Sequence, residues 1–202
     1  MNRVYVGATS AVLAVAIGGA AVWTALNQES SCGGNAIAGG NVAIGGPFEL
    51  MNGDGMLVTD GDVIDGPTLV YFGYTFCPDV CPFDVARNAI AVDILAEQGL
   101  DVTPVFISID PERDTPEIVA QYAADMHPKM IGLTGSPEQV KAASQAYKTY
   151  YARGTGEGEF YLMDHSTFTY LMLPNTGLAS YFGRDVQPEE MAEQTACHIA
   201  AN

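Results

Sequence analysis

Apolar and polar positions along the chain follow two patterns, one typical of buried strands and one typical of helices. Residues 68–73 and 102–109 are continuous β-prone apolar runs, which indicates strands buried on both faces of a sheet. From Pro82 to Gly99 apolar residues recur at helical spacing, with proline suited to the first turn and glycine to the end. The order strand, helix, strand predicts a parallel pair joined by a right-handed crossover.

The remaining apolar pattern predicts further helices, each entered through a proline, and further strands. The expected helices are residues 116–126, 137–150 and 188–199. The expected strands are residues 48–50, 130–133, 160–163, 167–173 and 178–181, with a polar loop at 153–158. Because the last two strands form a hairpin, antiparallel strands join the parallel ones. The predicted fold class is α/β, a central mixed sheet flanked by helices.

A charge-free stretch near the N-terminus, residues 4–26, is long enough to cross a hydrocarbon core of about 30 Å. Arg3 precedes it and no Lys or Arg follows until Arg87, which predicts a cytoplasmic N-terminus and an exported C-terminal part. The alternative is a cleaved signal peptide, but the run exceeds the about 7–15 apolar residues of a signal core. We therefore expect an N-terminal transmembrane helix that is retained.

This organisation predicts three segments. Residues 1–26 form the membrane anchor, and residues 27–46, rich in Gly, Asn and Ser, form a flexible linker. Residues 47–202 form one folded domain. We expect a single-pass protein of the bacterial inner membrane whose C-terminal domain lies in the periplasm.

The chain is strongly acidic. Its 202 residues include 24 Asp and Glu but only 8 Lys and Arg, so the formal net charge is −16. Such a surface repels nucleic acid phosphates, which excludes nucleic acid as a partner. The negative electrostatic field of such a surface favours a cation or a basic protein surface as the partner.

Two of the four cysteines, Cys77 and Cys81, lie between a buried strand and a helix start. Sites in α/β sheets gather at the carboxyl ends of strands, and helix N-termini favour the thiolate form. An inert pair of structural thiols is the alternative, which this placement disfavours. Dithiol redox enzymes commonly have two residues between their cysteines. The three intervening residues found here change the geometry of the loop and can make both sulfurs accessible to a metal.

His165, between two predicted late strands, is the candidate for a third ligand. A loop there can meet the cysteine loop in space, although a single histidine is more often a surface or packed residue. Two thiolates and an imidazole suit three-coordinate Cu(I), whereas structural zinc usually takes four protein ligands. Cu(II) would need further donors, which Asp79, Asp164 or water could supply.

The remaining chemistry-bearing residues have simpler interpretations. Cys32 and Cys197 could pair with each other, stay free or bind metal adventitiously, and we expect neither to contribute to the site. The carboxylates of Asp110, Glu112 and Asp114 are interpreted as turn, capping and Arg113-pairing groups around a helix start, where Asp114 and Thr115 are the expected capping residues.

Four segments together resemble the Sco/SenC family. They are residues 74–82 (YTFCPDVCP), 107–115 (ISIDPERDT), 132–135 (GLTG) and 164–166 (DHS). The resemblance extends over about residues 47–200. It implies a thioredoxin-like fold, an N-terminal membrane anchor and copper held by Cys77, Cys81 and His165. It also implies a function in maturing the dinuclear copper centre in subunit II of cytochrome c oxidase.

Two functions therefore remain open for this domain. A metallochaperone would take copper, as Cu(I) or Cu(II), from a periplasmic donor and pass it to the copper domain of subunit II. A thiol–disulfide oxidoreductase would use Cys77 and Cys81 as a redox dithiol to keep target cysteines reduced. A thiol peroxidase is disfavoured. Such an enzyme is expected to carry a threonine three residues before its cysteine, whereas Thr75 precedes Cys77 by two. Only the copper site should need His165.

Overall fold

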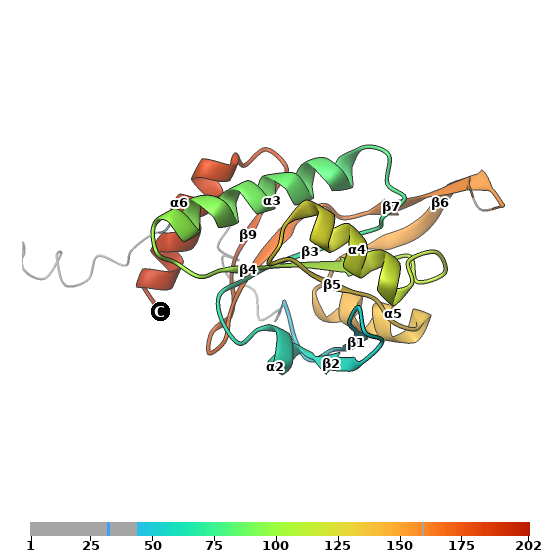
Figure 1. The fold of residues 1–202 in the computed structure, drawn as a ribbon, viewed down its shortest axis with the longest axis horizontal. Helices are drawn as coiled ribbons and strands as arrows, with labels where there is room; N and C mark the ends of the chain where they lie inside the picture. The colour runs from blue at the N-terminus through green and yellow to red at the C-terminus, as the bar shows by residue number, and fades with distance from the viewer. Residues whose placement is uncertain (1–31, 33–43, 159) are drawn as a thin grey trace, which may run out of the picture. The chain divides into compact units, whose positions relative to one another are not determined.

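The computed structural model describes Cys32 and residues 44–158 and 160–202, which fold around a five-stranded sheet (Figure 1). In spatial order its strands are β5 (Ile131–Leu133), β4 (Thr103–Ser108), β3 (Thr68–Gly73), β8 (Thr169–Leu173) and β9 (Gly177–Phe182). β3 is parallel to β4, and β4 to β5, whereas β8 is antiparallel to both of its neighbours. The predicted mixed sheet is confirmed.

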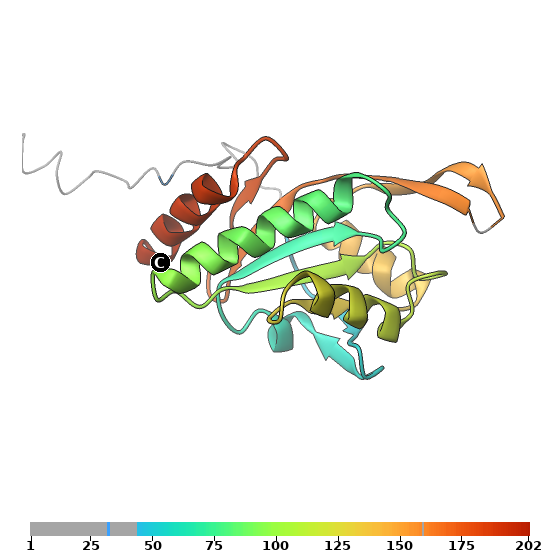
Figure 2. The ribbon, with the colours of Figure 1, turned by 45° about the horizontal axis from the view of Figure 1, so that its top comes forward.

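Helices cover both faces of the sheet (Figure 2). On one face lie α3 (Val80–Glu97), α4 (Pro116–Met126) and α6 (Pro188–Ala200), and on the other lies α5 (Pro137–Ala146). Each of the four expected helices is therefore present. α5 ends at Ala146 rather than near Tyr150, because Lys148 takes a left-handed conformation with φ of 54°.

Strand β3 is the centre of the core. All six of its residues are buried, as the continuous apolar run predicted. Side chains alternate between the two faces. Tyr71 points toward α3, where its hydroxyl meets Asp84, and Phe72 points toward α5, with its ring 5.2 Å from that of Tyr147. The strand therefore fixes the start of α3 directly over its carboxyl end.

A small hairpin precedes the main sheet. It consists of β1 (Glu49–Met51) and β2 (Leu57–Thr59), followed by the short helix α2 (Asp60–Val63). The strand at β1 and the turn after it were expected, and the Asn52 side chain accepts hydrogen bonds from two backbone amides of that turn. β2 and α2 had no signal in the apolar pattern, because with three and four residues they are too short to show a periodicity.

The prediction of a polar loop at 153–158 is wrong. These residues belong to β6 (Tyr151–Glu157) apart from Gly158, and β6 pairs with β7 (Phe160–His165) in a two-stranded sheet of its own. The sequence does not indicate this strand, because its residues are glycine-rich and largely exposed and so show no apolar alternation. Gly156, at φ 126°, lies at an irregularity in the pairing that only glycine accommodates easily.

The expected anchor at residues 4–26 lies outside the described residues, as does almost all of the linker at 27–46. Among the residues that the structure describes, no helix combines the length and apolar character needed to cross a membrane.

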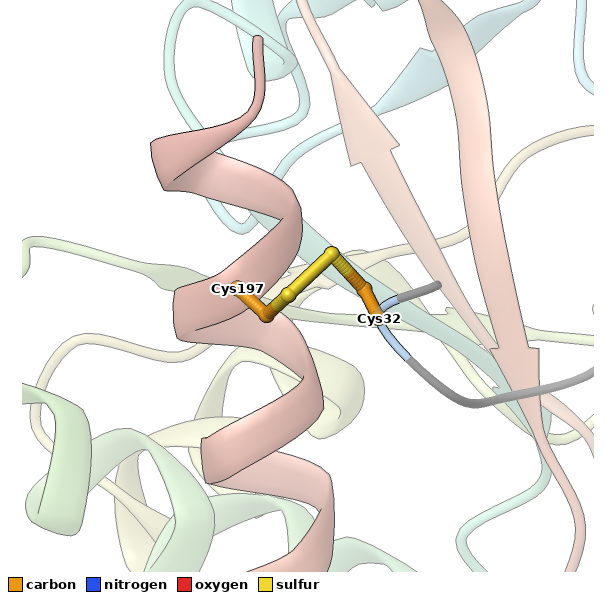
Figure 3. The surroundings of a disulfide bond; sticks show 2 residues. All are labelled: Cys32 and Cys197. Atoms are coloured by element: carbon orange, nitrogen blue, oxygen red, sulfur yellow. A yellow bond between two sulfur atoms is a disulfide. The ribbon is translucent and has the colours of Figure 1, made fainter. Parts of the chain in front are cut away.

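A disulfide joins Cys32 to Cys197 on α6 (Figure 3). The Cα atoms are 5.4 Å apart, and the two residues are separated by 165 positions in the sequence. Of the three alternatives considered for these cysteines, the structure shows pairing. Cys77 and Cys81 are both free thiols, so the bond leaves the cysteine pair at the end of β3 untouched.

The Cys32–Cys197 bond should stabilise the domain without affecting metal binding. Closing a loop of this length lowers the conformational entropy of the unfolded chain, which raises the free energy of unfolding by up to about 5 kcal/mol. The double variant Cys32→Ser/Cys197→Ser should unfold at a temperature lower by at least several degrees in a calorimetric scan. Reducing the parent protein should lower its unfolding temperature similarly, and the variant should not respond to the reductant. Equal unfolding temperatures for parent and variant would contradict this prediction.

Candidate metal centre

The cysteine pair lies where β3 ends and α3 begins. Residues 74–79 form the connecting loop, which carries Cys77, and Cys81 is the second residue of α3. The Cys81 N–H donates to the Cys77 sulfur at 3.4 Å, so an amide of the helix N-terminus points at that sulfur. Cys77 is half-buried and Cys81 is buried, so only Cys77 is accessible to an approaching partner.

The last residue of β3 allows Cys81 to pack against the sheet. A Cβ atom added at Gly73 would lie 2.9 Å from the Phe106 ring and 3.1 Å from the Cys81 sulfur. Carbon atoms in good contact are about 3.5–4.0 Å apart. Any side chain here would therefore clash with the Phe106 ring and crowd the Cys81 sulfur.

His165, the last residue of β7, reaches the same place from a distant part of the chain. Its Nε2 lies 3.3 Å from the Cys81 sulfur. The ligand atoms of Cys77, Cys81 and His165 all lie within 4.8 Å of one another. In the part of the chain that the structure describes, no other group of three His, Cys, Asp or Glu side chains converges in this way. The structure thus brings together the three residues that were predicted from the sequence.

The His165 ring is oriented so that Nε2 can act as a ligand atom. Its Nδ1 lies 2.7 Å from the carbonyl oxygen of Ser166. Because a carbonyl oxygen only accepts, Nδ1 carries the proton and Nε2 of the neutral ring presents its lone pair. The rings of Tyr71 and Tyr74 meet the imidazole edge-on, with centroids 6.3 and 5.9 Å away, and restrict its rotation.

The two sulfurs differ in acidity. Hydrogen bonding with the Cys81 side chain, reinforced by backbone amides of Cys81 and Asp79, lowers the pKa of Cys77 well below its usual value. The same hydrogen bond, together with burial, raises the pKa of Cys81. At neutral pH the pair therefore holds one thiolate, on Cys77, and one proton, on Cys81. Binding a metal through both sulfurs releases that second proton.

Asp114 holds the cysteine loop in place and does not cap α4, so this one of the two predicted caps is wrong. Its buried carboxylate accepts from the Thr75 N–H at 3.0 Å and from the hydroxyls of Thr75 and Ser108, both at 2.5 Å. Thr115, the other predicted capping residue, is confirmed, since its side chain accepts from the Ile118 N–H. Burial raises the pKa of Asp114, against these hydrogen bonds. The sequence could not reveal this role, because aspartate before a helix is an ordinary capping signal.

A buried polar network lies behind Cys81 and was also not predicted. The Tyr71 hydroxyl donates to Asp84 at 3.0 Å, and Asp84 lies 3.9 Å from Arg87 and 3.5 Å from Arg184. Arg87 donates to the hydroxyl of Thr169 on β8 at 3.0 Å. The network ties the first turns of α3 to the sheet, which holds Cys81 in place.

The site opens to solvent through a shallow cavity of about 280 Å³. Cys77 and His165 both line it, together with the exposed carboxylate-bearing residues Asp79 and Asp164. Both aspartates were considered as further donors from the sequence, and the structure places them at the cavity wall.

Known proteins that resemble this chain in sequence and in fold include SenC and Sco proteins. The family model described as SCO1/SenC matches residues 38–200. Protein SenC of Rhodobacter capsulatus is 54% identical over 158 residues, which cover 78% of this chain and 72% of that protein. Arabidopsis thaliana ScoI, solved with copper bound, has a TM-score of 0.75 and 43% identity, covering 78% of this chain and 99% of that chain. Yeast Sco1 with copper bound has a TM-score of 0.73 and 32% identity, covering 79% and 90%.

The match to the family model, over residues 38–200, includes the cysteine loop and the β6–β7 hairpin. The mixed sheet flanked by helices is the thioredoxin-like Sco fold, as the resemblance implied. The family model spans most of the sequence, and a relative more than half identical is matched over most of its own length. The chain therefore belongs to the SCO1/SenC family.

Proposed function

We propose that this protein is a copper metallochaperone that holds its cargo with Cys77, Cys81 and His165. The observation that carries the proposal is the convergence of two sulfurs and one imidazole nitrogen within 4.8 Å. Two homologous structures contain copper, which supports the choice of metal. The proposed recipient is the copper domain of cytochrome c oxidase subunit II, and the proposed source is a periplasmic copper donor.

The donor set fits copper better than other common metals. Thiolates are soft ligands that select Cu(I), and three donors complete a trigonal site for that ion. Structural zinc sites usually have four protein ligands. Cu(II) would need further donors, and the carboxylates of Asp79 or Asp164 in the same cavity are placed to supply one.

The proposed ligands are unequally buried, which suggests the order in which they release copper. Cys77 faces the cavity, so a thiolate of the recipient reaches copper on that side and replaces Cys77 as a ligand. Cys81 lies at the bottom of the site and is released last. Each exchange keeps the number of sulfur ligands constant, so copper never becomes free in solution.

The proposed location is the periplasmic face of the bacterial inner membrane, with residues 1–26 as the anchor, 27–46 as the linker and 47–202 as the domain. The disulfide joins Cys32, within the proposed linker, to Cys197 on α6 of the domain.

Copper titration of the reduced protein tests the proposal. Competition with a Cu(I) chelator should show one tight site per chain. Cys77→Ser or Cys81→Ser should abolish tight binding, and His165→Ala should weaken it at least about tenfold. His198→Ala is the matched control, because His198 lies on α6 and is not part of the site. If His165→Ala binds Cu(I) as tightly as the parent, the three-ligand site is wrong.

A thiol–disulfide oxidoreductase is the second candidate, favoured by the acidity and access of Cys77. Its thiolate would attack a target disulfide and expel one target thiolate, forming a mixed disulfide. Cys81 would lose its proton, attack the Cys77 sulfur and release the second target thiol. The target gains two electrons, and this protein ends with a Cys77–Cys81 disulfide. His165→Ala should leave this reduction intact while weakening copper binding, which separates the two functions.

The reactivity of Cys77 should depend little on pH. Cys81, Tyr74 and His165 face it within the site, with Asp79 at the rim, and the bond from Cys81 contributes most to its low pKa. Its alkylation by iodoacetamide, followed by mass spectrometry, should keep nearly the same rate from pH 8 to pH 6. A cysteine with the usual pKa of about 8.5 slows about tenfold for each pH unit.

Cys81→Ala provides the control for this measurement. Removing the hydrogen-bond donor should raise the pKa of Cys77, so the alkylation rate of the variant should fall as the pH is lowered. A parent protein that already shows the ordinary tenfold slope would contradict the assignment of the thiolate to Cys77.

A further inference from the structure

Among the described residues, the hairpin that carries His165 makes no backbone pairing with the central sheet. β6 and β7 pair with each other and project from the body of the domain (Figures 1 and 2). Residues 166–168 join His165 to β8, and side-chain contacts between hairpin and body add to this covalent connection in positioning His165 over the cysteines.

One residue of the body makes several of these contacts. Arg113, in the loop between β4 and α4, donates from Nη1 to the carbonyl oxygen of Tyr161 on β7 at 2.9 Å. Its guanidinium also stacks on the Tyr161 ring, 3.6 Å from the centroid. Tyr161 is four residues before His165 in the same strand, so the two side chains share one face of β7.

A buried carboxylate holds Arg113 and Tyr161 in contact with each other. Asp110 is only 2% exposed, and both of its oxygens are engaged. One accepts from Arg113 Nε at 2.5 Å and the other from the Tyr161 hydroxyl at 2.6 Å. The carboxylate thus fixes both sides of the contact, and a buried pair of this kind is costly to break from one side.

The same guanidinium also reaches the other half of the site. It lies 4.9 Å from the ring centroid of Phe76 and 5.7 Å from that of Tyr74, both in the cysteine loop. Tyr74 in turn meets the His165 ring edge-on. Arg113 is therefore in contact with the strand that carries His165 and with the loop that carries Cys77.

We propose that Arg113 is a positioning residue that holds His165 over the two cysteines by clamping the β6–β7 hairpin to the cysteine loop. The inference rests on the proposed function, since it assigns His165 as a copper ligand. The clamp raises the local concentration of the imidazole at the metal, so loosening it weakens copper binding only as far as His165 contributes.

Arg153 supplies a matched comparison. It stacks on the Tyr161 ring as closely as Arg113 does, at 3.7 Å, but belongs to the hairpin itself. Its side chain is half-exposed, and its partner Glu112, at 3.7 Å, is more exposed still. Substituting Arg153 removes an arginine–tyrosine contact of the same kind without freeing the hairpin from Asp110.

A double-mutant cycle in the reduced full-length protein tests the clamp. Cu(I) affinity is measured by chelator competition for the parent, Arg113→Met, His165→Ala and the double variant. Arg113→Met should weaken binding about tenfold in the parent and by less than about twofold in the His165→Ala background. Arg153→Met should change the affinity by less than about twofold. Equal weakening by Arg113→Met in both backgrounds would show a merely structural role and overturn the proposal.

A copper-free readout separates the clamp from the metal function. In the NMR spectrum of the apo protein, the His165 ring protons should be shifted by the rings of Tyr71 and Tyr74. Arg113→Met should move these signals toward the values of an exposed histidine, whereas Arg153→Met should not. If they stay in place, the clamp is wrong even where copper binds. If they move but the parent binds no copper, the clamp stands and the proposed function fails.

A milder variant covers the case in which Arg113→Met does not fold. Tyr161→Phe removes only the hydroxyl that bonds to Asp110 and keeps the ring and carbonyl that Arg113 contacts. It should shift the His165 signals in the same direction by a smaller amount. Unchanged His165 signals in a folded Tyr161→Phe would also count against the clamp.

Discussion

The approach of the Cys81 sulfur to the His165 imidazole, at 3.3 Å, is the contact on which the site depends. Its two sides are built differently. Cys81 is buried at the start of a long helix, beneath a glycine that leaves it room, and a polar network behind it joins that helix to the sheet. His165 ends a hairpin that lies outside the central sheet and is held by its covalent connections and by contacts with side chains of the body, such as Arg113. The site therefore combines one sulfur fixed in the core with an imidazole donor that is carried by a hairpin outside the central sheet.

The hydrogen bond between the two sulfurs gives them separate roles. It makes Cys77 a thiolate and keeps the proton on Cys81, so only one of the two is ready to react at neutral pH. A metal needs both sulfurs deprotonated, whereas attack on a disulfide needs only Cys77. The same dithiol can thus serve either function. What distinguishes them is His165, which a disulfide exchange does not use and a three-coordinate Cu(I) site does.

The parts of the structure that could be predicted from the sequence are those with a local signal. β3 and the helix after it follow from apolar spacing, and their junction marks Cys77 and Cys81 as the reactive pair. The contact between Arg113 and Tyr161 could not be predicted, because residues 48 positions apart leave no trace in periodicity. β6 is exposed and glycine-rich, so it resembled a loop. Asp114 carries a capping signal but serves the cysteine loop, since tertiary hydrogen bonds outweighed the local preference.

The proposed copper chaperone must bind its cargo tightly and still release it on meeting the right partner. A site with three equally rigid ligands would favour retention, because every ligand would have to leave against the packing of the core. Here the two buried anchors, Cys81 and Asp114, belong to the core, whereas Cys77 faces a cavity and His165 is borne by a separate sheet. In the proposed transfer, a recipient thiolate would replace Cys77 from the cavity, and displacement of the hairpin would remove the imidazole donor. Affinity in isolation and release on contact can then be set by different residues.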